Sequence, residues 1–270
     1  MKGDLHVHTR ISDGSYTTKE ILELAKQKGL THIGITNHDT VEGIEEAIKL
    51  GEEIGVKVIP GIEISAYDFK RKRKVHILGY NFNLEAPNIV KLCTPTLVKR
   101  NINSKIQMER LIYEGYDIDV KYINELSKKS KVIYKQHIMD ALIQKHYTDS
   151  IYSDLYRRLF KNNGICAMDI EYVDYKDAVQ AIIKDGGRAV LAHPAQYDSY
   201  DIIDDLISNG LWGIEVNHHC HSEEDRKRIR KIAKENNLVL TGGTDFHGKY
   251  NEKNVQLGDF LCPEESLKYF

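Results

Sequence analysis

The chain has 270 residues, of which 41% are hydrophobic and 29% charged, and its formal net charge is −2. This composition is not that of a disordered tail, and no apolar run approaches the roughly 18 residues of a membrane span. The 12 histidines stand beside 4 cysteines that form no C-x-x-C pair, which excludes a disulfide scaffold and a thiolate zinc finger and favours a reducing cytoplasm. The first residues, Met1 to Asp4, lack a signal-peptide core, and we expect them to begin the fold.

Alternating strands and helices are predicted along most of the chain. A cap at Thr17 and the spacing of Ile21, Leu22 and Ala25 predict the first helix, which ends at Gly29. The other expected helices cover residues 41–54, 174–184, 200–208 and 223–235. The expected strands cover residues 3–7, 32–36, 56–64, 75–80, 188–192, 212–216 and 238–241. This order predicts a parallel α/β fold with seven core strands, either a barrel or an open doubly wound sheet.

Residues 88–164 differ from the rest of the chain. They are expected to be mostly helical, and they contain fourteen Lys or Arg against eight Asp or Glu, a net charge of +6. Ten of the 12 histidines lie outside this segment. One interpretation is a basic insertion that attracts an anionic substrate, and the other is a set of solvated helix faces.

Side chains that can bind metal ions follow nearly every expected strand. His6 and His8 end the first strand and lie on one side of it, because side chains alternate along a strand. The carboxyl ends of parallel strands meet at one edge of a sheet, where functional groups gather. The further candidates at this edge are Asp13, His38, Glu63, His76, His193, Asp245 and His247.

These nine groups are too many for one metal ion. Because four-coordinate zinc uses at most about four protein ligands, the set predicts two or three divalent ions. A mixed shell of imidazole and carboxylate suits Zn, Mn or Fe better than Ca or Mg. Clustered divalent ions lower the pKa of a bridging water and bind charged oxygens, which suits the hydrolysis of phosphate esters.

The candidate ligands stand in motifs that suggest a family. These motifs are His6-x-His8, Asp13, His38-Asp39, Gly61-Ile62-Glu63, His76, Leu191-Ala192-His193-Pro194 and Gly242-Gly243-Thr244-Asp245-Phe246-His247. The ordered set resembles the PHP superfamily, named for polymerase and histidinol phosphatase, and within it the stand-alone metal-dependent phosphoesterases. The resemblance implies a distorted seven-stranded, TIM-like β/α barrel made of residues 1–87 and 165–270. Residues 88–164 would form a helical insertion that serves as a cap or faces the substrate.

The resemblance also implies a role for each candidate ligand. The first metal would be held by His6, His8, Glu63 and Asp245, the second by Glu63, His76 and His193, and the third by Asp13, His38 and His247. Glu63 would bridge two metals and, with Asp245 and His193, form the catalytic centre. Hydrolysis would proceed through attack of a metal-bound hydroxide on phosphorus.

Three positions depart from the usual family pattern. Asn37 stands where Asp is frequent, Lys135-Gln136-His137 where Arg-Pro-His is common, and Gln196 where a basic residue is frequent. Lys135 and His137 are candidate substrate-binding residues that contact phosphate, with a solvated lysine and a packed histidine as the alternative.

Residues after the strand at 212–216 have less definite roles. Glu215 is a candidate to orient a ligating histidine. The neighbouring histidines, His218, His219 and His221, are expected at the rim of the site.

The implied function is hydrolysis of a phosphate ester in a small phosphorylated substrate, for example a nucleoside 3′,5′-bisphosphate. The alternatives are a 5′-to-3′ exonuclease on short RNA, a histidinol phosphate phosphatase, and a non-catalytic PHP module that supports a partner. Stacking tyrosines would favour RNA, and the candidates are Tyr113, Tyr116, Tyr134, Tyr147, Tyr152 and Tyr156. We expect a phosphorylated small molecule or short oligonucleotide as partner, and neither a membrane nor an obligate protein partner.

Overall fold

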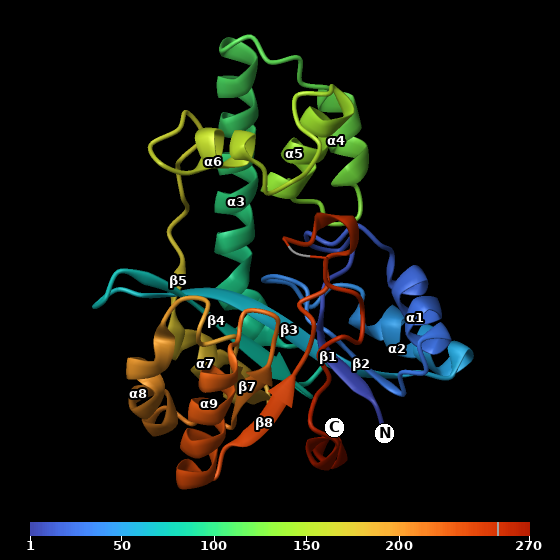
Figure 1. Cartoon of the computed structure of the whole chain (residues 1–270), viewed down its shortest axis with the longest axis vertical. Helices are drawn as coiled ribbons and strands as arrows, with labels where there is room; N and C mark the ends of the chain where they lie inside the picture. Colours follow the sequence, from blue (N-terminus) through green and yellow to red (C-terminus); the bar gives the residue numbers. More distant parts are fainter. Residues whose placement is uncertain (253) are drawn as a thin grey trace.

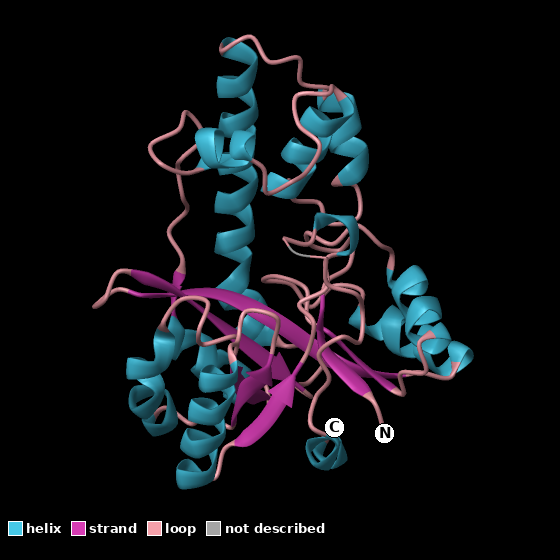
Figure 2. Cartoon of the chain, viewed as in Figure 1, coloured by secondary structure: helices cyan, strands magenta, loops and turns pink. Residues whose placement is uncertain are grey.

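A twisted sheet of eight strands, seven of which form a nearly closed barrel, lies below the helices α3 to α6 in Figure 1 and Figure 2. The computed structural model describes residues 1–252 and 254–270. Neighbouring strands follow the order β1-β2-β3-β4-β6-β7-β8, and the short β5 pairs with β3. The strands are β1 (Gly3–Val7), β2 (His32–Ile35), β3 (Lys57–Asp68), β4 (Arg73–Tyr80), β5 (Val173–Asp174), β6 (Arg188–Leu191), β7 (Gly213–Asn217) and β8 (Val239–Gly242). The predicted α/β barrel with seven core strands is confirmed.

β4 runs antiparallel to both of its neighbours, which the sequence did not indicate. β3 and β4 form a hairpin in which Gly61 lies opposite Tyr80 and Asp68 lies opposite Arg73. β4 pairs with β6 in the same antiparallel sense. Only residues 69–72 separate the two strands of the hairpin, and so short a connection cannot return the chain for a parallel pair. The expectation of a parallel sheet is therefore wrong at β4.

Helices cover the sheet from several sides. The α-helices are α1 (Thr18–Gln27), α2 (Ile44–Ile54), α3 (Pro87–Tyr113), α4 (Val120–Leu126), α5 (Lys135–Gln144), α6 (Asp154–Phe160), α7 (Tyr175–Lys184), α8 (Ile203–Ser208) and α9 (Glu223–Asn236), and the 3-10 helices are η1 (Ser199–Ile202), η2 (Gly248–Tyr250) and η3 (Glu264–Tyr269). In Figure 1, α1 and α2 lie beside β1 and β2, whereas α7, α8 and α9 cover the other half of the sheet. The cap expected at Thr17 is present, since its hydroxyl accepts a hydrogen bond from the backbone N–H of Glu20.

Four helices, α3 to α6, connect β4 to β5. α3 rises away from the sheet, and the three shorter helices pack beside its far half (Figure 1). They share an apolar core of their own, in which Leu111, Ile138 and Leu142 are fully buried. No helix in the described part of the chain is long and apolar enough to cross a membrane.

The barrel closes between β1 and the segment after β8. Val7 and Phe246 form an isolated parallel bridge there. Asp4, a fully buried carboxylate in β1, accepts the backbone N–H of Thr244 at 3.0 Å with one oxygen. Its other oxygen accepts the Thr244 hydroxyl at 2.6 Å and the Gly258 N–H at 2.9 Å. One buried side chain thus ties the first strand to the last loops.

We predict that Asp4→Asn destabilises the protein. In either orientation the new amide NH2 group points at a backbone N–H, of Thr244 or of Gly258, and leaves a buried donor without an acceptor. The expected loss in the free energy of unfolding is about 1–3 kcal/mol, measured by urea denaturation followed by circular dichroism. Asp149→Asn, at an exposed position, is the matched control. Equal stability of the two variants would contradict this role of Asp4.

Candidate metal centre

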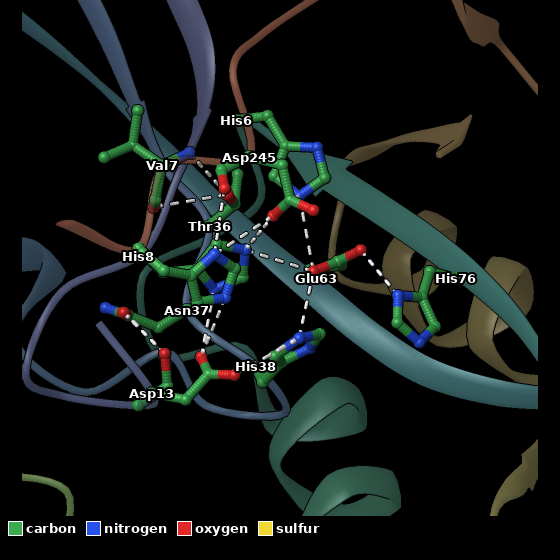
Figure 3. Close-up of polar contacts among 12 residues, drawn as sticks. His6, Val7, His8, Asp13, Thr36, Asn37, His38, Glu63, His76 and Asp245 are labelled. Atoms are coloured by element: carbon green, nitrogen blue, oxygen red, sulfur yellow. Dashed lines mark hydrogen bonds and ion pairs between the residues drawn. The ribbon is translucent and has the colours of Figure 1, made fainter. Parts of the chain in front are cut away.

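The carboxylate of Glu63, on β3, lies at the centre of the candidate site (Figure 3). It is 1% exposed, and five imidazole nitrogens surround its two oxygens. Oε2 lies 3.3 Å from His6 Nε2, 3.2 Å from His8 Nε2 and 3.3 Å from His38 Nε2, and Oε1 lies 2.7 Å from His76 Nδ1 and 2.9 Å from His193 Nε2. The structure therefore places five of the other eight candidate ligands around the carboxylate of Glu63.

The two aspartates among the candidates flank this centre. Asp245 Oδ1 lies 3.3 Å from His6 Nε2 and 3.0 Å from His8 Nε2. Asp13 Oδ1 lies 3.5 Å from His8 Nδ1 and 3.3 Å from His247 Nε2. All nine candidate ligands thus belong to one connected cluster, drawn in part in Figure 3.

The backbone turns sharply where the strands deliver these residues. Asp245, which follows β8, has a φ of +53°, a left-handed conformation that Asp tolerates better than most residues. Just before it, a Cβ on Gly243 would lie 2.4 Å from the backbone nitrogen of His6. Glycine at this position therefore lets the loop cross β1 closely enough for Asp245 to reach the cluster.

The three carboxylates are held in their ionised form. Burial alone would raise the pKa of Glu63, but the imidazoles of His38, His76 and His6 hold that pKa well below its usual range. The pKa values of Asp13 and Asp245 are also well below the usual range, because neighbouring histidines outweigh burial. In the described chain, no lysine or arginine forms an ion pair with any of the three. Three negative charges in one cluster, two of them on buried side chains and the third on the partly exposed Asp245, attract cations.

The donor atoms of the cluster fit divalent ions. Several of them are buried without a hydrogen-bond partner within the described residues: His6 Nε2, His8 Nδ1 and Nε2, Asp13 Oδ1, Glu63 Oε2, His193 Nδ1 and Asp245 Oδ1. Such atoms cost about 1–3 kcal/mol each when nothing binds them. The geometry groups His6, His8, Glu63 and Asp245 within ligand reach of one another, and likewise His8, Asp13, His38 and His247. Bound cations would satisfy both groups.

Glu215 lies directly behind the cluster, as its place in the sequence suggested. It is fully buried, and its Oε1 lies 3.1 Å from Nδ1 of His6. Its Oε2 accepts the backbone N–H of His193 at 2.9 Å. Because the Nδ1 side of the His6 ring faces Glu215, its Nε2 atom faces Glu63 and Asp245.

Asn37 supports the loop that carries Asp13. Its Oδ1 accepts the backbone N–H of Thr9 at 2.9 Å and the hydroxyl of Ser12 at 2.9 Å. An amide oxygen serves these bonds as well as a carboxylate would. The Asn at this position therefore leaves the candidate ligands in place.

The two candidate substrate-binding residues have different positions. Lys135 lines a cavity of about 340 Å³ that opens onto Asp13, Glu63 and Asp245. His137 is buried and lies outside the cavity lining, with its Nδ1 accepting the backbone N–H of Tyr134 at 3.3 Å. Gln136, between them, donates from Nε2 to Asp13 Oδ2 at 3.1 Å, so the first turn of α5 contacts the cluster directly.

Three cavity residues and the burial of two histidines were not predicted from the sequence. Lys74, Arg100 and Lys161 line the same cavity, and only the net charge of 88–164 hinted at the last two. His218 and His221 were expected at the rim but are buried, and His218 Nε2 lies 3.5 Å from Asp245 Oδ2. The local sequence gave no sign that the turn after β7 folds inward.

Comparison with known proteins gives consistent matches. The family model described as "PHP domain" matches residues 4–219. A phosphoribosyl 1,2-cyclic phosphate 1,2-diphosphodiesterase from Eggerthella lenta is 51% identical over 92% of this chain and 94% of its own length. A 5′-3′ exoribonuclease from Haemophilus influenzae is 27% identical (97% of each chain), and a 3′,5′-nucleoside bisphosphate phosphatase from Chromobacterium violaceum is 26% identical (90% of this chain, 86% of the relative).

A solved structure agrees with these matches. A protein from Bifidobacterium adolescentis, provisionally described as a metal-dependent phosphoesterase, superposes with a TM-score of 0.90 at 29% identity and covers 99% of this chain and 94% of that one. With such relatives and this cluster of donor atoms, the chain is a metal-dependent enzyme that hydrolyses phosphate ester bonds. It belongs to the PHP domain family.

Proposed function

We propose that the substrate is a phosphorylated ribose with a cyclic phosphate diester, which the enzyme opens by hydrolysis. The observation that carries the proposal is the 51% identity, over nearly all of both chains, to the Eggerthella lenta relative named for phosphoribosyl 1,2-cyclic phosphate. A nucleoside 3′,5′-bisphosphate is the second candidate, supported by the more distant Chromobacterium violaceum relative. Both substrates are riboses that carry two phosphate groups.

The dimensions of the cavity support a small substrate over an RNA strand. Its volume of about 340 Å³ lies at the lower end of the roughly 300–1,000 Å³ found for small-molecule sites. Of the tyrosines considered for base stacking, Tyr134, Tyr152 and Tyr156 line it. Tyr116 and Tyr147 instead line a separate hollow, so the tyrosines do not form one continuous platform.

We propose that the cluster holds two or three divalent ions of Mn, Zn or Fe, each bound by its own set of ligands. His6, His8, Glu63 and Asp245 hold the first ion; Glu63, His76 and His193 the second; and Asp13, His38 and His247 the third. The first set is supported because its four residues lie within ligand reach of one another and carry buried, unpaired donor atoms. The residues of the third set lie within reach of one another together with His8. The second set is supported by the 2.7 Å and 2.9 Å distances from Glu63 Oε1 to His76 Nδ1 and His193 Nε2. When bound, such ions supply Lewis acidity and lower the pKa of a water that can attack phosphorus.

The protein's own residues orient this centre and the substrate. Glu215 fixes the His6 ring, and Gln136 holds Asp13 through its amide. Lys135 contacts a phosphate oxygen as a point charge. His137 acts on Lys135 indirectly, because its bond to the Tyr134 N–H fixes the first turn of α5.

The helical segment 88–164 acts in this proposal as a cap on a barrel made of residues 1–87 and 165–270. The role of this segment as a cap is supported by its contribution of Arg100, Tyr134, Lys135 and Lys161 to the cavity lining. We also place the enzyme in the cytoplasm, since few, widely spaced cysteines suit a reducing compartment.

The substrate is tested with protein loaded with Mn²⁺. We expect hydrolysis of phosphoribosyl 1,2-cyclic phosphate with a higher kcat/KM than of adenosine 3′,5′-bisphosphate, a short 5′-phosphorylated RNA or histidinol phosphate. Products are followed by ³¹P NMR. A higher kcat/KM for one of the other three would replace the proposed substrate with that compound.

Glu63→Gln should be the most damaging single change. Because an amide cannot bridge two cations, we expect loss of at least one bound metal ion. We also expect kcat to fall more than about 100-fold, since replacing a residue that only contacts a metal ligand already lowers activity about 10–100-fold. Metal content is measured by plasma mass spectrometry on purified protein. The control is Glu52→Gln, at an exposed position, which should retain metal and activity. Full metal content in Glu63→Gln would refute the bridging role.

Glu215→Gln should have a smaller effect than Glu63→Gln. The shape is kept, but an amide orients the His6 ring less firmly than a carboxylate, so we expect the affinity for the first metal ion to fall about 10–100-fold. The measurement is a metal titration in competition with a chelating dye. Unchanged affinity would show that Glu215 serves packing alone.

A further inference from the structure

Four cationic side chains from four elements line the wall of the cavity beside the metal centre. Lys74 belongs to β4, Arg100 to α3, Lys135 begins α5, and Lys161 directly follows α6. Three of them come from the segment 88–164. Part of the positive net charge of that segment therefore lies on the wall of the cavity, and the rest lies elsewhere in the segment.

Two of the four cations already have carboxylate partners. Arg100 Nη2 lies 2.7 Å from Oδ2 of the buried Asp39. Lys74 Nζ lies 2.7 Å from Asp169 Oδ2, and the other oxygen of Asp169 accepts the Tyr172 hydroxyl at 2.5 Å. The Tyr172 ring also lies against Lys74, with its centroid 4.9 Å from Nζ. These contacts fix Lys74 in the wall.

The other two cations have no such partner. Among residues 1–252 and 254–270, neither Lys135 nor Lys161 forms an ion pair. Burial lowers the pKa of Lys135 to about 8; nearby Asp169 acts in the opposite direction, and Lys74 and Lys161 lower it further. A desolvated ammonium near other cations is costly unless an anion binds it. Among these four cations, two positive charges are thus in excess of their carboxylate partners.

We propose that Lys74, Lys135 and Lys161 form a subsite for a second phosphate group of the substrate, the one that is not hydrolysed. The proposal rests on the proposed function and deepens it, because it names the residues that would bind the phosphate on the side of the ribose away from the metal centre. A terminal phosphate carries about −1.5 to −2 charges at pH 7, which matches the two excess positive charges. The subsite selects substrates with two phosphate groups.

Two substrates that differ only in the second phosphate test the subsite. They are phosphoribosyl 1,2-cyclic phosphate and ribose 1,2-cyclic phosphate, assayed with Mn²⁺-loaded protein. We expect the native enzyme to prefer the first, in kcat/KM, by at least about 100-fold, since bonds to charged groups are among the strongest polar contacts. Lys161→Met and Lys135→Met should each lower this preference about 10- to 100-fold. Lys161→Arg keeps the positive charge and should retain most of the preference.

The control is Lys128→Met, which removes an exposed lysine of the same helical segment and should keep the native preference. A native enzyme without preference, or a preference unchanged in Lys161→Met and Lys135→Met, would overturn the subsite. A thermal melt of each variant identifies any that fails to fold. Because Lys161 is exposed, we expect its variants to fold.

A second pair of substrates separates the subsite from the proposed function. Adenosine 3′,5′-bisphosphate and adenosine 3′-monophosphate are assayed in the same way. If only this pair is hydrolysed and the preference depends on Lys161, the subsite holds and the cyclic phosphate is wrong as substrate. If neither pair is hydrolysed, calorimetric binding of ribose 5-phosphate decides: equal affinity for the native protein and Lys161→Met overturns the subsite, and weaker binding to the variant supports it.

Discussion

The contact of one buried carboxylate with five imidazoles is the constraint on which the active end of the barrel depends. Glu63 touches histidines from β1, from the turn after β2, from β4 and from the turn after β6, so four parts of the sheet meet at its two oxygens. Burying charge in this way costs free energy unless it is neutralised. We infer that the strand ends are arranged for binding cations, and that bound metal ions contribute to the stability of the fold as well as to its chemistry.

Closure of the barrel decides whether this arrangement can form. The first candidate ligand is His6 and the last is His247, so the site needs nearly the whole chain. The bond network of Asp4 and the bridge from Val7 to Phe246 hold the two ends of the sheet together. Without that closure, Asp245, in the loop after β8, would have no histidine of β1 beside it. The same few residues that complete the fold therefore complete the metal centre.

The sequence predicted the elements and the cluster because both follow from local rules. Strand spacing, the cap at Thr17 and the placing of His, Asp and Glu at strand ends indicated one edge of a sheet with nine neighbouring ligand groups, and the family resemblance implied that the sheet is a barrel. What it did not indicate depends on how strands pair and on contacts between distant residues. The reversed direction of β4 follows from a hairpin, the burial of His218 from an inward turn, and the lining of the cavity by Lys74 and Lys161 from the docking of helices on the sheet. No local pattern encodes these.

The two parts of the site have opposite charge and come from different parts of the chain. Every candidate metal ligand lies outside residues 88–164, whereas Arg100, Lys135 and Lys161 lie inside them. The relatives are named for a cyclic phosphate, RNA and a nucleoside bisphosphate, which share a phosphate ester and differ in the remainder of the substrate. A barrel rim that handles the ester can serve all three if the helical wall alone is changed, as the loops of a scaffold change its specificity. Under the proposed metal sets and phosphate subsite, the rim would determine the reaction, and the cationic wall would determine which phosphate ester is bound.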